Sequence, residues 1–338
     1  MSASPTASSQ LVRVDDSVSF LNSGGQNIVC KSWSADAEPR SALVFLAHGY
    51  AEHCHDPSYD ALARALVGLG CYVFAHDHVG HGKSDGPRAT VTSADVYVDD
   101  ILSHVDTVRA KSSGKPVYLV GYSMGGLLVV RAVQRRPKDF AGMVLLAPLL
   151  GVEQVSWFKA NLVRVLGRLL PSLPIAKTAV ELACRDPVAV KQMNDDPLRY
   201  RGNVSAGWAA AIFSALEVRA YSALSCLIRM IAAHAEVNVL ELPIFIQHGS
   251  GDKLCDPDAS FGFFKNAPSK DKSIKIYSDA YHSLLKEPEG VGQQALKDIV
   301  NWCSSRLPTE EETPAVQPRL SDQQQSDAAT LTAMPSTA

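Results

Sequence analysis

Ser123 stands in a sequence that suits a catalytic nucleophile. Residues 121–126 read Gly-Tyr-Ser-Met-Gly-Gly, directly after the apolar, β-rich run 117–120 and before the helix-length apolar run 127–133. A serine on a sharp strand-to-helix turn needs glycines around it, because side chains there would collide as the hydroxyl is pushed out above the sheet. The pattern predicts that Ser123 attacks acyl groups.

A serine hydroxyl needs a base that takes its proton and a carboxylate that orients the base. On a strand–serine–helix turn of this type the partners follow in the order serine, acid, histidine. Asp252 follows the apolar run 244–247 through a Gly-rich turn, and His282 follows the run 273–277 through a short loop. We predict Asp252 as the acid and His282 as the base. Asp256 is the rival acid, but it precedes a proline and lies a turn further on.

Two other histidines follow predicted strands. We expect His48 to shape the turn after its strand, and His248 precedes the acid with no room to swing independently. Acyl transfer also needs donors for the oxyanion, one from the residue after the nucleophile and one from the loop after the first central strand. The backbone N–H groups of Met124 and Tyr50 are the predicted donors.

The alternative of a metal-dependent hydrolase rests on His76, His78 and His81. These residues approximate the His-x-His-x-Asp-His motif of metallo-hydrolases. Gly80 occupies the position of the motif's aspartate. The segment is better explained as a tight turn that leaves a strand, Asp-x-x-Gly-x-Gly-x-Ser from Asp77 onward. We therefore expect neither a metal nor a cofactor.

Short apolar runs rich in β-formers alternate with helix-length segments, which is typical of a mostly parallel sheet covered on both faces. The predicted strands are 42–47, 71–75, 117–121, 143–147, 244–247 and 273–277. Between the second and third, Val98, Ile101, Val105 and Val108 follow helical spacing, with Thr92 or Ser93 as the N-cap. The pattern predicts an α/β-hydrolase fold, with a mostly parallel central sheet, flanking helices and a helical cap insertion.

The β/α alternation stops between residues 149 and 239, where prolines punctuate a helical pattern. We expect residues 11–148 and 240–307 to form the core, 149–239 a cap over the carboxyl ends of the strands, and 1–10 and 308–338 disordered tails. The stretch 157–173 mixes large apolar residues with Lys159, Arg164 and Arg168. Such a cationic amphipathic segment either docks on a membrane or packs on the core, and the sequence leaves both open.

The composition and charge of the chain argue against some kinds of partner and cellular location. The 338 residues are 46% hydrophobic and carry a formal net charge of -3 without long basic runs, which argues against nucleic acid. The first residues do not resemble a secretory signal, and the longest apolar runs are about half of the ~20 residues that span a bilayer. Seven scattered cysteines favour free thiols. We expect a cytoplasmic protein.

Together these residues resemble the monoglyceride lipases, also called monoacylglycerol lipases, over nearly all of residues 15–305. The resemblance rests on five stretches: His48-Gly49 with Glu52-His53, 74–82 with Ser84, 121–126, 252–256, and 280–282 with Lys286-Glu287. It implies cleavage of the single acyl ester of a monoacylglycerol to glycerol and a free fatty acid, without a cofactor. It also implies peripheral association with membranes through an apolar cap.

The resemblance implies the same triad of Ser123, Asp252 and His282 and the same oxyanion donors, Tyr50 and Met124. It marks Cys255 as a regulatory thiol beside the site, and we predict Glu52, Trp157 and Leu285 as substrate-binding residues. Leu285 stands where animal members carry a second histidine, and the loop after Glu52 lacks their arginine. Because of these departures, the sequence does not determine which headgroup the protein prefers. A lysophospholipase or another single-chain carboxylesterase is therefore the alternative, and a non-catalytic lipid-binding protein a remote one.

Overall fold

The computed structural model describes residues 11–35, 41–112, 114–151, 157–216 and 239–308. The chain divides into two units, 1–307 and 308–338. The second unit, apart from Pro308, lies outside the described residues, and so does the predicted tail 1–10. The side chain of Trp157 is also outside the described part.

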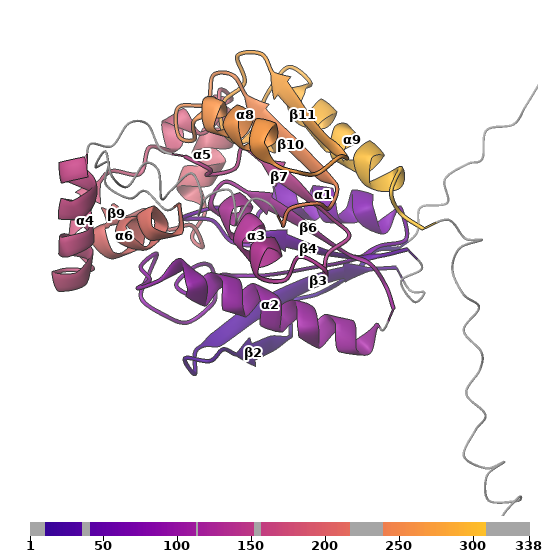
Figure 1. The fold of residues 1–338 in the computed structure, drawn as a ribbon, viewed down its shortest axis with the longest axis horizontal. Coiled ribbons are helices and arrows are strands. Elements are labelled where there is room, and N and C mark those ends of the chain that lie inside the picture. Colours follow the sequence, from indigo (N-terminus) through magenta and orange to yellow (C-terminus); the bar gives the residue numbers. More distant parts are fainter. Residues whose placement is uncertain (1–10, 36–40, 113, 152–156, 217–238, 309–338) are drawn as a thin grey trace, which may run out of the picture. The chain divides into compact units, whose positions relative to one another are not determined.

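One large sheet organises the first unit (Figure 1). Its order within the described residues is β1-β3-β5-β4-β6-β7-β10-β11, with β2 also paired to β3. The strands from β5 to β11 run parallel, whereas β1, β2 and β5 pair with β3 antiparallel. The bounds are β1 Arg13–Asp15, β2 Ser19–Leu21, β3 Asn27–Ser34, β4 Leu43–Ala47, β5 Tyr72–His76, β6 Val117–Tyr122, β7 Gly142–Leu146, β10 Ile244–Gly249 and β11 Lys272–Tyr277.

Alternating side chains of each central strand build two apolar cores. In β4, Phe45 and Ala47 face one core while Val44 and Leu46 face the other, as the period of two along a strand requires. Helices α2 (Ala94–Lys111), α3 (Met124–Arg135) and α8 (Pro257–Asn266) cover the first face. Helices α1 (Pro57–Val67) and α9 (Val291–Ser304) cover the second. This arrangement confirms the predicted α/β-hydrolase architecture.

The predicted strands are all present, with ends shifted by up to two residues. Of the two N-cap candidates for α2, Ser93 is the one, since its side chain accepts a hydrogen bond from the N–H of Asp95. Strands β1 to β3 were not among the predicted ones. Strands β1 and β2 lie at the sheet edge and have three residues each, too few for an alternating pattern to show, and β3 lies between them and β5.

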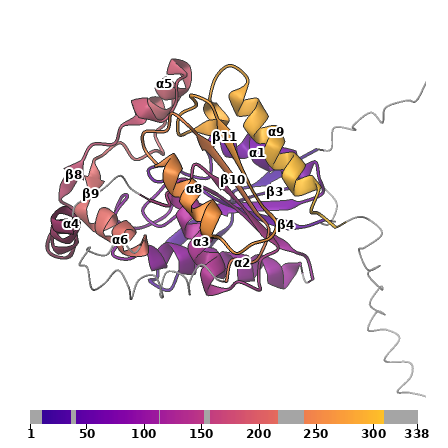
Figure 2. The same ribbon diagram turned by 45° about the horizontal axis from the view of Figure 1, so that its top comes forward.

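The segment between β7 and β10 holds α4 (Trp157–Leu169), β8 (Pro174–Ala176), η1 (Val180–Leu182), α5 (Pro187–Asp195), β9 (Val204–Ser205) and α6 (Ala206–Ala215). Figure 2 shows α4, α6 and the two short strands together, with α5 apart from them. The small β8–β9 sheet differs from the all-helical expectation, and α4 ends at Leu169 because Pro171 cannot continue it. None of the described helices is both long and apolar enough to cross a membrane.

Helices α4 and α6 pack closely because small residues face each other. A Cβ atom on Gly167 would lie 2.5 Å from the Cβ of Ala210 and 2.7 Å from the carbonyl oxygen of Ala206. A larger side chain at Gly167 would therefore push the two helices apart. The contact fixes the position of α6, which forms part of the site described next.

Candidate active site

Ser123 occupies the turn between β6 and α3 in a strained conformation. Its φ is 55° and its ψ is −118°, a left-handed φ that is unusual for a residue with a side chain. A Cβ on Gly121 would lie 2.4 Å from the carbonyl oxygen of Gly125, and one on Gly125 would lie 2.2 Å from that of Ala47. The two glycines are therefore required for the turn that presents the serine hydroxyl.

Asp252 lies just after β10 and is held as a carboxylate. Its Oδ1 accepts the backbone N–H groups of Leu254 at 2.8 Å and Cys255 at 3.0 Å. Its Oδ2 lies 2.6 Å from Nδ1 of His282 and 3.0 Å from Nε2 of His248. Burial by itself would raise the pKa of Asp252, but these hydrogen bonds and the nearby His282 hold it well below its usual range. The residue is therefore ionised at neutral pH.

His282 lies after β11 and is almost fully buried. Its ring packs against that of Tyr122, with 5.0 Å between centroids, and the Tyr122 hydroxyl lies 2.8 Å from Oγ of Ser283. Because Nδ1 faces Asp252, Nε2 is the ring nitrogen left for a proton from the serine. The sequence analysis gave Tyr122 and Ser283 no role, because their contact joins segments that are 161 residues apart.

Ser123, His282 and Cys255 line one pocket, of about 230 Å³ and open to solvent. Within the described residues the Ser123 hydroxyl makes its polar contact with Sγ of Cys255, at 3.9 Å, rather than with His282. Catalytic hydrogen bonds often tighten only when substrate is bound. Burial and then Asp252 raise the pKa of Cys255 well above its usual value, so the thiol beside the serine is neutral.

Of the two residues that carry the predicted oxyanion donors, Tyr50 lines the pocket that contains Ser123 and Met124 directly follows the serine. Met124 begins α3, and the first N–H groups of a helix have no partner within the helix. Tyr50 is in the loop after β4, and its ring lies 4.0 Å from that of Trp208 in α6. The Trp208 indole donates a hydrogen bond to Sδ of Met124 at 3.3 Å. Trp208, which sequence reasoning missed, thus touches both residues that carry the predicted donors.

His48 fixes the loop that carries Tyr50. Its Nδ1 lies 2.8 Å from the carbonyl oxygen of Gly49, and its Nε2 accepts the backbone N–H of His78 at 2.9 Å. Burial lowers the pKa of His48 to about 4, so the ring is neutral, with Nδ1–H as donor and Nε2 as acceptor. His48 therefore joins the turn after β4 to the turn after β5.

Glu52 lines the pocket as predicted, and its charge is neutralised there. Its carboxylate accepts the Tyr59 hydroxyl at 2.9 Å and Nη1 of Arg199 at 2.7 Å. Burial would raise the pKa of Glu52, but Arg199 and then Lys286 lower it to about 2. The polar end of the pocket is thus a buried ion pair between the loop after β4 and the segment after α5.

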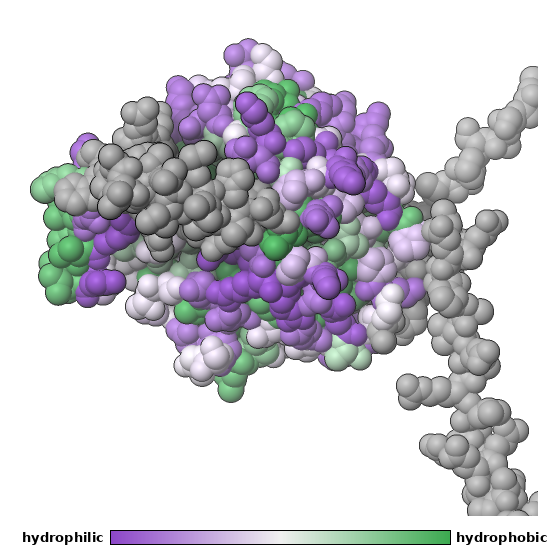
Figure 3. All heavy atoms as spheres, viewed as in Figure 1, coloured by the Kyte–Doolittle hydropathy of each residue, from purple (hydrophilic) through white to green (hydrophobic). Residues whose placement is uncertain are grey.

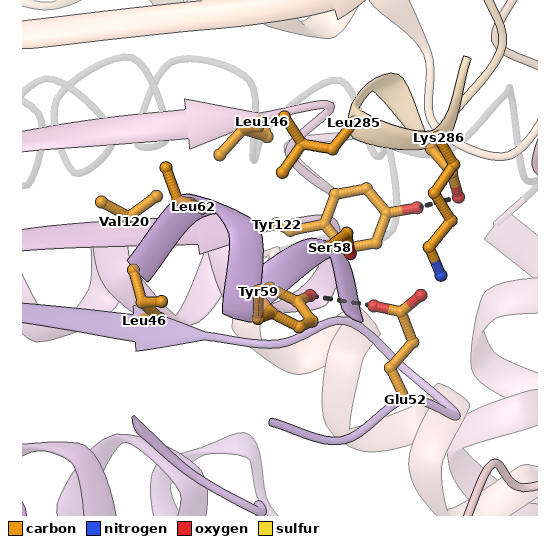
Figure 4. Close-up of a pocket in the computed structure, with 11 residues that line it drawn as sticks. Leu46, Glu52, Ser58, Tyr59, Leu62, Val120, Tyr122, Leu146, Leu285 and Lys286 are labelled. Carbon is orange, nitrogen blue, oxygen red and sulfur yellow. Dashed lines mark hydrogen bonds between the residues drawn. The ribbon is translucent and has the colours of Figure 1, made fainter. Parts of the chain in front are cut away.

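Leu285 differs from its predicted place. It lines a small neighbouring cavity of about 20 Å³, which Tyr122 also lines, and not the pocket that contains Ser123 (Figure 4). Apolar side chains from β4, β6, β7 and α1 form the wall around it, and Glu52, Tyr122 and Ser283 belong to both cavities. Leu285 points away from the serine because it lies in the short 3₁₀ turn η2 (Leu284–Lys286) that follows the histidine loop.

The segment between β7 and β10 is bonded to both catalytic loops. The N–H of Ser283 donates to the carbonyl oxygen of Ala183 at 2.6 Å, directly after His282. At the other loop, the N–H of Tyr200 donates to the carbonyl oxygen of Ala51 at 3.0 Å, directly after Tyr50. The segment therefore fixes the backbone on two sides of the pocket.

Two histidines of the metal-like motif, His76 and His78, bond to each other, whereas Nδ1 of His81 lies 3.1 Å from the carbonyl oxygen of Val79. His76 lies between His104 and His78, with 3.2 Å from Nδ1 of His76 to Nδ1 of His104 and 3.2 Å from its Nε2 to Nδ1 of His78. Burial lowers the pKa of His76 and of His78 well below the usual value, which keeps both rings neutral. The run therefore forms a chain of neutral imidazoles beneath the loop that carries Tyr50.

Cys54, His55 and Asp77 bring three ligand-type atoms within 4.8 Å of one another in the described part of the chain. The Asp77 oxygens already accept the N–H groups of Cys54 at 2.8 Å and Lys83 at 2.7 Å. Burial and then Asp77 raise the pKa of the Cys54 thiol well above its usual value, which opposes the thiolate that a metal needs. These hydrogen bonds explain the group as a link between the loop after β4 and the loop after β5.

Comparison with known proteins gives a consistent result. A family model described as serine aminopeptidase, S33, matches residues 38–289. The chain is 36% identical to human monoglyceride lipase over 309 residues, covering 91% of this chain and 96% of the relative. It is 31% identical to monoacylglycerol lipase of Mycolicibacterium smegmatis over 290 residues, covering 86% and 97%.

Comparison with solved structures supports the same family. The monoacylglycerol lipase of Paleococcus ferrophilus superimposes with a TM-score of 0.69 at 30% identity, covering 82% of this chain and 99% of the other. Together with the strained serine and the Asp252–His282 pair, these likenesses confirm the resemblance drawn from the sequence. The chain is a serine hydrolase and belongs to the monoglyceride lipase family of α/β-hydrolases.

Proposed function

We propose that this protein hydrolyses the ester of monoacylglycerols through an acyl-enzyme on Ser123. The observation that carries the proposal is the 2.6 Å bond between Asp252 and His282 at the wall of the pocket that also contains Ser123. His282 takes the serine proton as Ser123 attacks the ester carbonyl, and the N–H groups of Tyr50 and Met124 hold the oxyanion. The ester C–O bond breaks as glycerol leaves with the proton from His282.

The second half of the cycle uses the same groups. His282 removes a proton from a water molecule, which attacks the acyl-enzyme carbonyl and displaces Ser123. Ser123 recovers its proton from His282, and the free fatty acid leaves. No cofactor takes part, since each proton removed is returned within the pair of steps.

The buried ion pair at the polar end of the pocket supports a neutral headgroup. The carboxylate of Glu52 is matched by the guanidinium of Arg199, so this pair has no net charge that would attract a phosphate or an ammonium group. An acyl chain gains ~0.8 kcal/mol for each methylene that it buries. Binding energy therefore comes mainly from the chain, and the relatives' substrates favour a monoacylglycerol over a lysophospholipid.

We further propose that residues 149–239 act as a cap that docks on membranes through α4. Phe158, Leu162, Val165 and Leu169 are 46–72% exposed on this helix, and Leu170 follows at 54%. Figure 3 shows the apolar surface that they form at one edge of the molecule. Such a face places the pocket beside the lipid phase, from which a poorly soluble ester enters.

The test is hydrolysis of 2-arachidonoylglycerol, a lysophosphatidylcholine and a short p-nitrophenyl ester, with fluorophosphonate labelling alongside. The wild type should prefer the monoacylglycerol and label on Ser123. Ser123→Ala should lose hydrolysis and labelling. The control is Ser41→Ala, because the Ser41 hydroxyl bonds to the carbonyl oxygen of Leu69 and not to a residue of the pocket; this variant should keep hydrolysis and labelling. If Ser123 is labelled but lysophosphatidylcholine is the preferred substrate, the mechanism holds and the proposed substrate is wrong. Turnover by Ser123→Ala would exclude the mechanism.

A further inference from the structure

A second histidine is bonded to the acid of the triad. His248 lies in β10, and its side chain is completely buried. Its Nε2 lies 3.0 Å from Oδ2 of Asp252, the same oxygen that bonds to His282, and its Nδ1 lies 2.8 Å from Oγ of Ser260 in α8. The four side chains form a chain in the order Ser260, His248, Asp252, His282.

We propose that His248 is a positioning residue for Asp252, and that Ser260 selects the tautomer in which it works. The inference rests on the proposed function, because it assigns His248 a role only if Asp252 orients the catalytic base. His248 does not touch the reacting atoms. It acts through the carboxylate.

The hydrogen bonds determine the tautomer of His248. Oδ2 of an ionised carboxylate only accepts, so Nε2 of His248 must carry a proton. A neutral ring then has its lone pair on Nδ1, where the Ser260 hydroxyl donates. Without Ser260, the proton could move to Nδ1, and the lone pair of Nε2 would face the carboxylate. Ser260 is itself fully buried, so no bulk water replaces it.

With His248 in place, the Asp252 carboxylate has one orientation. Oδ1 accepts two backbone N–H groups, from Leu254 and Cys255, and Oδ2 accepts the two imidazoles. Rotation about the last side-chain bond would break all of these bonds together. A carboxylate locked in this way keeps His282 in the tautomer and the plane that proton transfer needs.

His248 also adjusts the basicity of His282. Its N–H dipole points at Oδ2 and weakens the negative potential that His282 experiences there. Among the described residues, Tyr122 and Cys255 also contact the pair, and both stay neutral because burial raises each pKa well above its usual value. Removal of the His248 donor should therefore strengthen the attraction between the Asp252 carboxylate and a protonated His282.

The experiment compares His248→Leu, His248→Gln and Ser260→Ala with the wild type, using 2-arachidonoylglycerol. Fluorophosphonate titration counts the active sites, and thermal unfolding reports whether each variant folds. The matched control is Tyr118→Phe, which removes a hydrogen bond between the buried Tyr118 and the carbonyl oxygen of Arg306. It removes one polar contact of a buried side chain without touching the triad or the Tyr50 loop, and its kcat should equal that of the wild type.

We expect His248→Leu to lower kcat per titrated site by roughly ten- to a hundredfold, as loss of a hydrogen bond to a charged group implies, with KM nearly unchanged. The acid limb of its kcat/KM profile should move to higher pH. His248→Gln, whose amide N–H can replace Nε2–H, should recover most of kcat and the original acid limb. Ser260→Ala should lie between the two.

The outcomes separate this role from the proposed function. If Asp252→Asn keeps its turnover, the triad itself is wrong and so is the role of His248. If Asp252→Asn is inactive but folded His248→Leu and Ser260→Ala match the wild type, only the positioning role is overturned. Should His248→Leu fail to fold, the pH profile of Ser260→Ala decides: an unmoved acid limb and an unchanged kcat in this variant would reject the role.

Discussion

Glu52 and Arg199 form a buried ion pair at the polar end of the pocket, with 2.7 Å between Oε1 and Nη1. Glu52 belongs to the loop after β4, and Arg199 belongs to the segment between α5 and β9. Tyr59 donates a further hydrogen bond to the carboxylate, as Figure 4 shows. The pair therefore links the loop that carries a predicted oxyanion donor to the proposed cap.

Removal of one partner should destabilise the protein strongly. In Arg199→Met the Glu52 carboxylate stays buried without its guanidinium, which typically costs about 3–5 kcal/mol of unfolding free energy. Arg64→Met is the control, because Arg64 pairs with Asp60 on the exposed surface of α1 and its loss should cost less than about 1 kcal/mol. Urea unfolding measures both. Equal losses in the two variants would mean that the buried pair has no special role.

The same pair predicts a pH dependence of stability. The pKa of Glu52 is about 2 in the folded protein against an ordinary value of 4.5. A carboxyl group with a lowered folded pKa stabilises the fold above its unfolded pKa, and this contribution is lost as the pH falls toward the folded value. The difference in unfolding free energy between wild type and Glu52→Gln should therefore shrink between pH 4.5 and 2. A constant difference over that range would contradict the assignment.

The choice of acid can be tested with two isosteric changes. Asp252→Asn should keep the fold and lower kcat by about 10⁴, since an amide no longer enforces the tautomer of His282. Asp256 caps α8 by accepting the N–H of Asp258, and asparagine caps a helix about as well. Asp256→Asn should therefore retain both stability and turnover of 2-arachidonoylglycerol. The reverse result would make Asp256 the acid.

Modification of Cys255 should block the site. Its Sγ lies 3.9 Å from Oγ of Ser123, so an adduct of N-ethylmaleimide would occupy space that the ester carbonyl needs. Because burial and Asp252 raise its pKa, reaction should be slow at neutral pH and faster at higher pH. Loss of hydrolysis should track Cys255 labelling by mass spectrometry, and Cys255→Ala should resist the reagent. Inactivation of Cys255→Ala at the same rate would point to another thiol.

The exposed face of α4 predicts membrane binding. Leu169→Asp places a charge at a side chain that is 72% exposed, and it should reduce co-sedimentation with phosphatidylcholine vesicles without changing hydrolysis of a short soluble ester. The control is Leu21→Asp in β2, where the leucine is 71% exposed on a different element. If both variants bind vesicles as the wild type does, α4 is not the docking face.

Much of the site could be predicted because its residues follow strands. Buried strands give short apolar runs, and a Gly-rich turn before Asp252 or after Ser123 marks where a side chain leaves the sheet. The order of Ser123, Asp252 and His282 along the chain then follows from the fold. Residues of this kind carry a local signal, so one sequence suffices to propose them.

Other features depend on contacts between distant segments. Arg199 lies 147 residues from Glu52, and nothing near it in the sequence marks it as a partner. His248 was set aside as a rival base because it lacks room to move, and that same restriction is what holds it against Asp252. Leu285 was assigned to the substrate pocket because animal members of the family carry a second histidine at its position, but it lies in a 3₁₀ turn and lines a neighbouring cavity.

The backbone bonds from Ala183 to Ser283 and from Tyr200 to Ala51 bear on protein engineering. Exchange of lid segments between relatives is a common way to alter the specificity of an enzyme. Here a transplanted segment would have to reproduce hydrogen bonds beside both the catalytic histidine and the Tyr50 loop, or turnover would fall for reasons unrelated to substrate choice. Junctions in chimeras of this enzyme should therefore lie outside residues 183–200, so that both backbone bonds stay in place.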